Sequence, residues 1–293
     1  MNTPNAALPT HVAISTHAGS GFMWAARDTM AMVWRNLTVV RRVPQLLVFA
    51  LVQPLIFVFM FRYVFGGAIP SGAAGLPYVD YLMPGIFVQT VTFGAINTAV
   101  GLAEDKNKGL LERLKSLPMS RSAVLGGRVL ADTTRNVFVV TMMLFVGFLV
   151  GFNTHTNALK VAAGVGLMVL FGFAICWIFA LIGLSVTNGE AAQAAAFPLL
   201  APLTFASNAF VPPDTMPDWL RWWAERQPLS ITVRGVRALM LGTEPMDYVW
   251  GSIAWSLAIT AVLAPLAVRR FRQLALRQWA QAVASSSARS RCA

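Results

Sequence analysis

Residues 161–189 read VAAGVGLMVLFGFAICWIFALIGLSVTNG, a stretch of 29 positions without one charged side chain. An α-helix rises 1.5 Å per residue, so about 20 apolar residues cross the hydrocarbon core of a bilayer. Backbone amides inside lipid must be paired within their own segment, which favours a helix over a strand. The stretch therefore predicts a membrane-spanning helix.

Five more runs of 19–24 residues also lack Asp, Glu, Lys and Arg. Each is long enough to span a bilayer, so the chain is predicted to be an all-α integral membrane protein with six transmembrane helices. The predicted spans cover residues 45–66, 80–101, 136–152, 161–187, 192–211 and 248–268.

The composition agrees with a single membrane domain. Hydrophobic residues make up 56% of the 293 residues and charged residues 12%, with no second composition that would indicate a separate soluble domain. We expect a disordered leader over residues 1–20, the transmembrane domain over 21–275 and a basic cytoplasmic tail over 276–293. Two cysteines supply no disulfide or metal framework.

The basic residues predict the orientation. The segment before the first span, the connection between spans two and three, and the tail after residue 268 together hold 17 of the 23 Lys and Arg residues. By the positive-inside rule, these segments and both termini lie in the cytoplasm, against the lipids of the cytoplasmic membrane. The four arginines of residues 212–247 accompany five acids and do not outweigh this bias. Nucleic acid is a poorer partner for the +11 net charge, because no soluble domain remains to bind it.

Two amphipathic segments precede spans. Residues 22–43 place apolar side chains at helical spacing, which predicts an interfacial helix. Residues 104–117 combine a leucine stripe with a charged face. Gly109 can break this helix from the second span, and Pro118 ends it. On pattern alone, this second segment is either a solvated surface helix or a docking helix for a cytoplasmic partner.

The residues around this segment resemble a known family. Residues 102–132, LAEDKNKGLLERLKSLPMSRSAVLGGRVLAD, are similar to the signature of type-2 ATP-binding-cassette (ABC) exporter permeases, in particular the daunorubicin/doxorubicin-resistance branch. A second match is FVPPDTMPDWLRW at 210–222, followed by QPLS at 227–230, VRAL at 236–239 and Gly242. The resemblance extends over about residues 22–274, and neither motif identifies a substrate.

The resemblance implies a multi-pass permease that exports a hydrophobic or amphipathic compound, such as an anthracycline-like drug or a lipid. It implies a separate cytoplasmic ATPase subunit that holds ATP and Mg²⁺, a second permease that is identical or homologous, and outer re-entrant helices that cap the exit path. The ATPase would contact the interfacial helix and a cytoplasmic coupling helix. The coupling residues implied are Glu104, Asp105, Gly109, Leu110, Leu111, Glu112, Arg113, Leu114, Leu117 and Pro118.

The chain itself shows no enzyme site. A phosphate loop needs a lysine directly after its last glycine, and none of the four lysines follows glycine. No cofactor is expected on the chain. The three histidines, at 11, 17 and 155, lie in the leader and an outer loop and predict no catalytic or metal site.

Two rival functions remain open. An ion-coupled secondary exporter would carry a titratable relay inside the membrane, and the six uncharged runs contain no Asp, Glu or central His. A membrane-embedded lipid-modifying enzyme would cluster carboxylates or histidines at one membrane face, and such groups cluster only in the predicted coupling segment.

Polar and aromatic side chains mark a candidate substrate pathway on two spans. They recur at helical spacing and, because polar groups avoid lipid, are expected to face protein or a cavity. Hydrogen bonding between helices is the alternative role. In the resembled family, spans two and five meet across a permease dimer and line the exit route. The candidate residues are Gln89, Phe93 and Asn97 on the second span and Phe197, Thr204 and Asn208 on the fifth.

Overall fold

The computed structural model describes residues 45–64, 77–108 and 121–291, with four single positions between 30 and 38. These residues form helices and no strand. The predicted interfacial helix at 22–43 lies outside them, apart from those four positions. The helices are α2 (Gln45–Phe59), the π-helical turn η1 (Met60–Val64), α3 (Tyr78–Gly94), α4 (Ile96–Asn107), α6 (Arg121–Val150), α7 (Ala158–Ser185), α8 (Gly189–Phe205), the 3-10 turn η3 (Pro213–Thr215), α9 (Asp218–Arg226), α10 (Pro228–Met240) and α11 (Asp247–Arg291).

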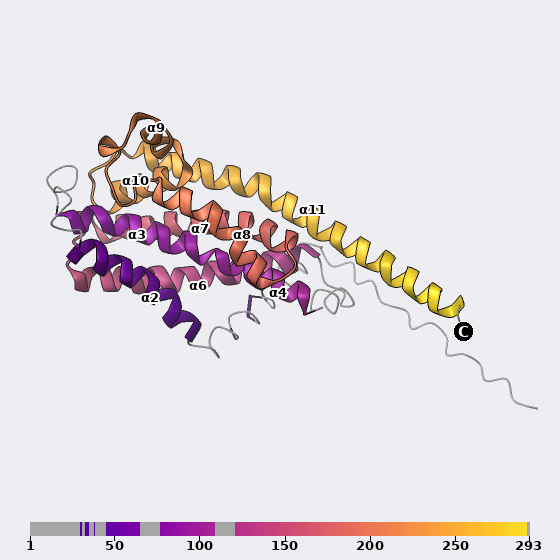
Figure 1. Cartoon of the computed structure of the whole chain (residues 1–293). Helices are drawn as coiled ribbons and strands as arrows, with labels where there is room; N and C mark the ends of the chain where they lie inside the picture. The colour runs from indigo at the N-terminus through magenta and orange to yellow at the C-terminus, as the bar shows by residue number, and fades with distance from the viewer. Residues whose placement is uncertain are drawn as a thin grey trace, which may run out of the picture.

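The long helices lie side by side in one bundle (Figure 1). Helix α7 packs against α4, α6, α10 and α11, and α3 packs against α6, α7 and α10. The short helices α9 and α10 lie at one end of the bundle, called here the α10 end, and α4 finishes towards the opposite end, called the α4 end. Helix α11 begins near α10 and projects beyond the bundle at the α4 end.

Within the part of the chain that the structure describes, four helical segments are long and apolar enough to cross a membrane. Two are mainly surrounded by protein: the most apolar window is 67% buried in residues 78–107 and 56% buried in residues 158–185. The corresponding windows in residues 125–150 and 247–271 are 28% and 17% buried, so those helices present most of their apolar surface outward. The predicted spans at 45–66 and 192–211 correspond to the shorter α2 with η1 and to α8, which contains two prolines.

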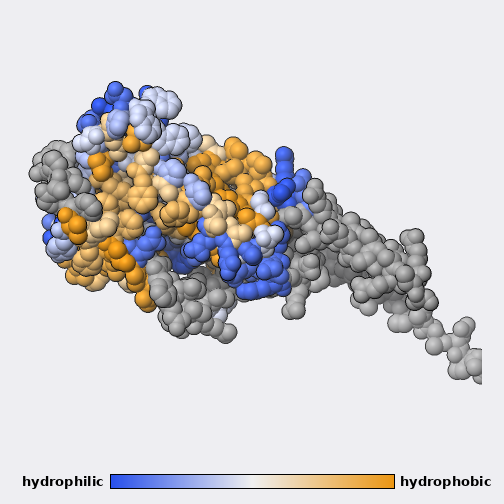
Figure 2. Space-filling view, viewed as in Figure 1, coloured by the Kyte–Doolittle hydropathy of each residue, from blue (hydrophilic) through white to orange (hydrophobic). Residues whose placement is uncertain are grey.

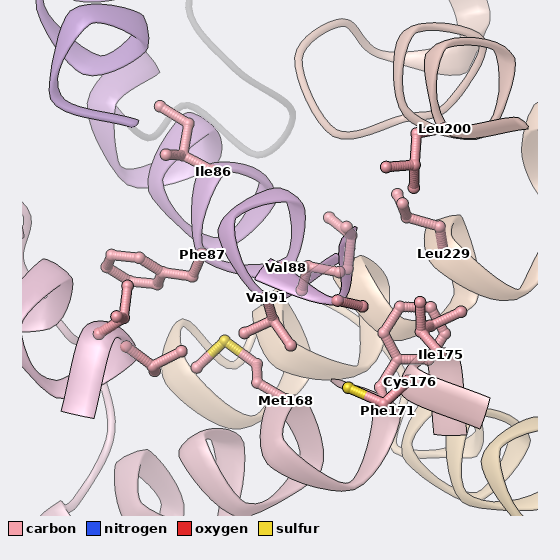
Figure 3. Close-up of a cluster of buried hydrophobic side chains, with 14 of the residues drawn as sticks. Ile86, Phe87, Val88, Val91, Met168, Phe171, Ile175, Cys176, Leu200 and Leu229 are labelled. Carbon is pink, nitrogen blue, oxygen red and sulfur yellow. The ribbon is translucent and has the colours of Figure 1, made fainter. Parts of the chain in front are cut away.

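Figure 2 shows apolar residues over the middle of the bundle and hydrophilic residues at the α10 end and near the end of α4. Within the bundle, α3 and α7 supply much of the core, where Val88 and Val91 lie near Met168 and Phe171 (Figure 3). Close approach is required at Gly85, because a Cβ atom there would overlap the backbone of Ala209. An alanine at this position would push apart α3 and the turn that follows α8.

Three helical regions differ from the predicted spans and tail. The second predicted span is two helices, because the α-helical ladder is interrupted at Ala95. Helix α6 begins at Arg121, 15 residues before the predicted third span, because side chains from another helix satisfy its charged residues. At the other end of the chain, α11 continues through the expected basic tail as far as Arg291.

Candidate functional site

A cavity of about 70 Å³ lies between α2, α3, α4 and α6. Its lining residues come from the central turns of α2 and α6 and from the junction of α3 with α4. The lining combines aromatic, amide and cationic side chains. The residues are Gln53, Pro54, Phe57, Gln89, Thr90, Phe93, Gly94, Asn97, Arg135, Asn136 and Val139.

All three candidate pathway residues of the second predicted span line this cavity. Gln89 is buried, Phe93 is half-buried and Asn97 is exposed, so the three follow the cavity from its floor to its mouth. The fifth-span candidates are not with them. Phe197 on α8 is 57% exposed, whereas Thr204 and Asn208 are buried, and Asn208 lies beyond the end of α8. None of the three fifth-span candidates lines the cavity, although α8 packs against α4. The role of both stripes in transport remains a prediction.

The floor of the cavity holds polar atoms without partners. Gln89 and Asn136 are each 3% exposed. Among the described residues, neither Nε2 nor Oε1 of Gln89 has a hydrogen-bond partner, and the same is true of Nδ2 of Asn136. A buried polar group without a partner costs about 1–3 kcal/mol. Four other such atoms, in Trp177, Thr204, Asn208 and Gln227, lie outside the cavity, so the cavity is distinguished by holding three of them together.

The backbone next to the cavity is irregular. The carbonyl of Gly94, at the junction of α3 with α4, accepts hydrogen bonds from the Arg135 guanidinium at 2.7 Å and from Asn97 Nδ2 at 3.1 Å. On α2, Pro54 lines the cavity and contributes no backbone N–H to its helix. Interrupted helices of this kind expose backbone polar groups and are tolerated at membrane depth only where protein or a cavity satisfies them.

A charged cluster adjoins the cavity; we call Asp105, Arg128, Asp132 and Arg135 the Asp132 cluster. Arg128 lies 3.3 Å from Asp132 and 3.4 Å from Asp105, which joins α6 to α4. Asp132 also accepts a hydrogen bond from the Thr98 hydroxyl at 2.7 Å. The expectation of no acid within the spans is wrong here, because Asp132 is buried on α6 inside a helix apolar enough to cross a membrane.

The α4 end carries the two predicted coupling residues that the structure describes, Glu104 and Asp105. Glu104 forms an exposed ion pair with Lys108 at 2.9 Å, and this hydrogen bond raises the pKa of the Lys108 ammonium. Lys106 donates to the carbonyls of Leu184 at 3.4 Å and of Val186 at 3.0 Å, at the end of α7. The end of α4 is thereby tied to α7. The remaining coupling residues lie outside the described residues: Gly109, Leu110, Leu111, Glu112, Arg113, Leu114, Leu117 and Pro118.

At the α10 end, Arg237 is a buried group that the sequence analysis did not single out. Its guanidinium donates to the carbonyls of Tyr81, Asn208 and Ala209 at 2.9–3.2 Å and stacks on the Tyr81 ring at 3.6 Å. Burial lowers its pKa, although an arginine stays protonated in a protein. Arg237 therefore joins α10, α3 and the turn after α8.

His155, for which the sequence predicts no catalytic or metal site, has an ionisable partner far away in the sequence. Its Nε2 lies 3.3 Å from the carboxylate of Asp80, which is 1% exposed and also accepts from the Asn153 backbone at 2.9 Å. The same connection donates to the last carbonyls of α10, through the backbone of His155 to Met240 at 3.1 Å and through the hydroxyl of Thr156 to Leu239 at 2.7 Å. The pairing fastens the connection to the starts and ends of other helices. Its 75-residue separation hides it from helical spacing.

Comparison with known proteins identifies relatives along most of the chain. The sequence profile of the family described as ABC-2 type transporter matches residues 27–241. The daunorubicin resistance ABC transporter permease protein DrrB1 of Streptomyces coeruleorubidus is 34% identical over 248 residues, which cover 85% of this chain and 87% of that protein. The probable doxorubicin resistance ABC transporter permease protein DrrC of Mycobacterium tuberculosis is 25% identical over 222 residues, 75% of this chain and 79% of that protein. The putative transport permease ycf38 of Pyropia yezoensis is 29% identical over 238 residues, 78% of this chain and 76% of that protein.

Proposed function

This chain belongs to the ABC-2 type transporter family, and we propose that it is the permease subunit of an ATP-driven exporter. The exporter moves a hydrophobic or amphipathic compound, a drug such as an anthracycline or a lipid, out across the cytoplasmic membrane. The observation that carries the proposal is the 34% identity, over 85% of the chain, to a permease named for daunorubicin resistance.

In this proposal, ATP and Mg²⁺ are bound by a separate ATPase subunit, because none of the four lysines here completes a phosphate loop. The ATPase contacts residues 104–118, which begin in the last turn of α4. The ion pairs and hydrogen bonds of Lys106 and Asp105 support this role, because they connect the start of that segment to α7 and α6. A push on the segment would therefore reach two long helices at once.

The proposed topology has six spans within a transporter domain at 21–275, both termini in the cytoplasm, and the outer segment 212–247 folded back as re-entrant helices. The basic bias of alternate segments supports this orientation. A second copy or a homologous permease completes the unit. Cysteines placed singly at Ser15, Ser71 and Ser286, in a chain without Cys176 and Cys292, test the orientation. An impermeant thiol reagent applied to intact cells should label position 71 alone, and labelling at 15 without 71 would invert the topology.

An ion-coupled exporter is a weaker account of the buried acid Asp132. A relay carboxylate must take up and release its ion freely, whereas Asp132 is held by Arg128 at 3.3 Å and by the Thr98 hydroxyl at 2.7 Å. These contacts support a structural link between α4 and α6 instead.

The deciding experiment is uptake of daunorubicin into inverted membrane vesicles that contain this chain and its ATPase. We expect uptake that requires ATP hydrolysis and survives collapse of the proton gradient. Reversal of the charges at Glu112 and Arg113 together should abolish uptake while the chain remains inserted, because rim charges set docking rather than folding. Uptake that follows the proton gradient without ATP would refute the proposal, and normal export by the double variant would refute the coupling assignment.

A further inference from the structure

We infer that the cavity between α2, α3 and α6 is a binding site for an aromatic molecule with a hydrogen-bond-accepting oxygen group, such as a carboxylate, phenolate or ring carbonyl. The inference rests on the proposed export function, since it names the chemical class of the exported compound. It is carried by three observations on the cavity: unpaired amides on its floor, a cation in its wall and aromatic rings beside it.

The unpaired side-chain amides of Gln89 and Asn136 favour a ligand with polar atoms. Gln89 offers a donor and an acceptor, and Asn136 offers a donor, from side chains that are each 3% exposed. A polar atom at that depth gains a hydrogen bond only from something that enters the cavity, either a water molecule or a ligand group. The floor therefore presents more donors than acceptors.

The cation determines the sign of the ligand group. Arg135 donates to the Gly94 carbonyl at 2.7 Å, and its other terminal nitrogen forms an ion pair with Asp132 at 4.0 Å, a distance too long for a hydrogen bond. The described lining residues contain no carboxylate. An oxygen acceptor would meet donors from Arg135, Gln89 and Asn136, whereas an ammonium group would meet a like charge.

The size of the cavity limits what enters. A cavity of about 150 Å³ is known to enclose benzene. The volume of about 70 Å³ here is less than half of that, which suits one polar substituent rather than a ring system. The ring must then lie at the mouth. The half-buried rings of Phe57 and Phe93 line the cavity there and can stack on it, and the exposed amides of Gln53 and Asn97 complete the mouth.

The test uses two fluorescent probes with the same fused ring, anthracene-9-carboxylate and 9-(aminomethyl)anthracene in its ammonium form. Binding to the full-length chain in phosphatidylcholine nanodiscs is measured by fluorescence anisotropy without ATPase or nucleotide. We expect the carboxylate to bind at least about ten-fold more tightly than the ammonium, the scale of a hydrogen bond to a charged group. Equal binding of the two probes, or no binding of the carboxylate, would overturn the inference.

Gln89→Leu is the informative variant, because the folded chain gives the Gln89 amide no hydrogen bond to lose. We expect an unchanged or higher unfolding temperature together with carboxylate binding weakened about 5- to 30-fold. The matched control is Thr92→Val, a buried isosteric change on the same helix, whose hydroxyl bonds only to the Val88 carbonyl of its own helix at 2.7 Å. A Gln89→Leu protein that is folded and binds the carboxylate as wild type does would contradict the inference.

A second variant tests the binding site without changing the buried residues on the floor of the cavity. Gln53 is exposed at the mouth, so Gln53→Trp should fold normally and cover the opening. We expect it to weaken carboxylate binding by at least about ten-fold, and unchanged binding would contradict the inference. Because these measurements use no ATP, they fail or succeed separately from ATP-dependent uptake, which tests the export function.

Discussion

Two buried arginines, Arg237 at the α10 end and Arg135 beside the cavity, differ in how many hydrogen bonds their guanidinium groups donate. Arg237 donates to three backbone carbonyls, stacks on Tyr81 and is 2% exposed. Arg135 donates to one carbonyl and faces a cavity whose amides have no partners. A paired site of the first kind holds helices together, whereas the unpaired site leaves binding capacity for another molecule.

The largest effect should come from Arg237→Leu. It leaves the carbonyl of Ala209 without its buried donor and removes the link between α10 and α3, at a cost of about 3–5 kcal/mol. Heating a Cys292→Ser protein and following exposure of the buried Cys176 thiol measures the loss. The stability loss of Arg237→Lys should be intermediate, because lysine keeps the positive charge. A leucine variant as stable as wild type would mean that the paired site is not structural.

Asp132→Asn should have the next largest effect. The variant keeps an oxygen acceptor for the Thr98 hydroxyl and loses the charge that pairs Arg128, for a cost of about 2 kcal/mol. Adding Arg128→Gln should recover part of the loss in the same thiol assay, since it removes the charge left unpaired. Strictly additive losses would show that the two residues do not interact.

Phe93→Ala should separate a binding role of the cavity from a structural one. We expect it to change which compound is transported more than it changes the stability of the fold. The ring is half-buried, so we expect a stability loss of about 1 kcal/mol and a changed ratio of ATP-dependent uptake between the two anthracene probes. Asn97→Ala, at the mouth, should change the same ratio. Phe173→Ala is the control, since Phe173 is a half-buried ring on α7 that packs on Trp177. If both phenylalanine variants change the ratio equally, the cavity is not selective.

The smallest effect should come from Arg221→Ala on α9. This arginine is exposed and pairs with Asp214 at 2.8 Å and Glu225 at 2.9 Å, and pairs of this kind are screened by water. The unfolding temperature should not change measurably. A clear drop in the unfolding temperature would show that an exposed ion pair stabilises the fold as a buried one does. The difference between Arg237 and Arg135 would then depend on the number of paired groups and not on their burial.

The sequence predicts helices best where they cross lipid, because a spanning helix must be long and largely without charge. The uncharged run at 161–189 corresponds to α7, and the helical spacing of Gln89, Phe93 and Asn97 correctly predicts that they share a face. Periodicity fails for Phe197 and Thr204, whose environments differ although they lie seven residues apart on one helix. Helical spacing predicts which residues share a face of the helix. It does not predict which other helix packs against each turn of that face.

The charged sites could be predicted only in part, because most of their partners are distant in sequence. Asp132 lies four residues from Arg128, a pairing that helical spacing allows. It also accepts a hydrogen bond from Thr98, 34 residues away, and Arg237 donates to Tyr81, 156 residues away. Because spans are predicted from stretches without charged residues, the predicted third span begins after Arg135, whereas α6 begins at Arg121. A buried charge is stable only with such partners, and those partners are fixed by packing rather than by local pattern.

The interruption at Ala95 has a mechanical consequence. Asn107, at the far end of α4, lies 12 residues from Ala95, about 18 Å at 1.5 Å per residue, whereas Asn97 in the cavity mouth lies about 3 Å from it. If α4 tilts about Ala95, it is a lever with its fulcrum beside the cavity. Spin labels on Asn107 and on the exposed Leu130 of α6 would detect the tilt as a change in their separation when ATP binds to the assembled complex. The lengths of the two arms imply that a displacement at the α4 end reaches the cavity reduced about six-fold, with the force on the bound molecule increased by the same factor.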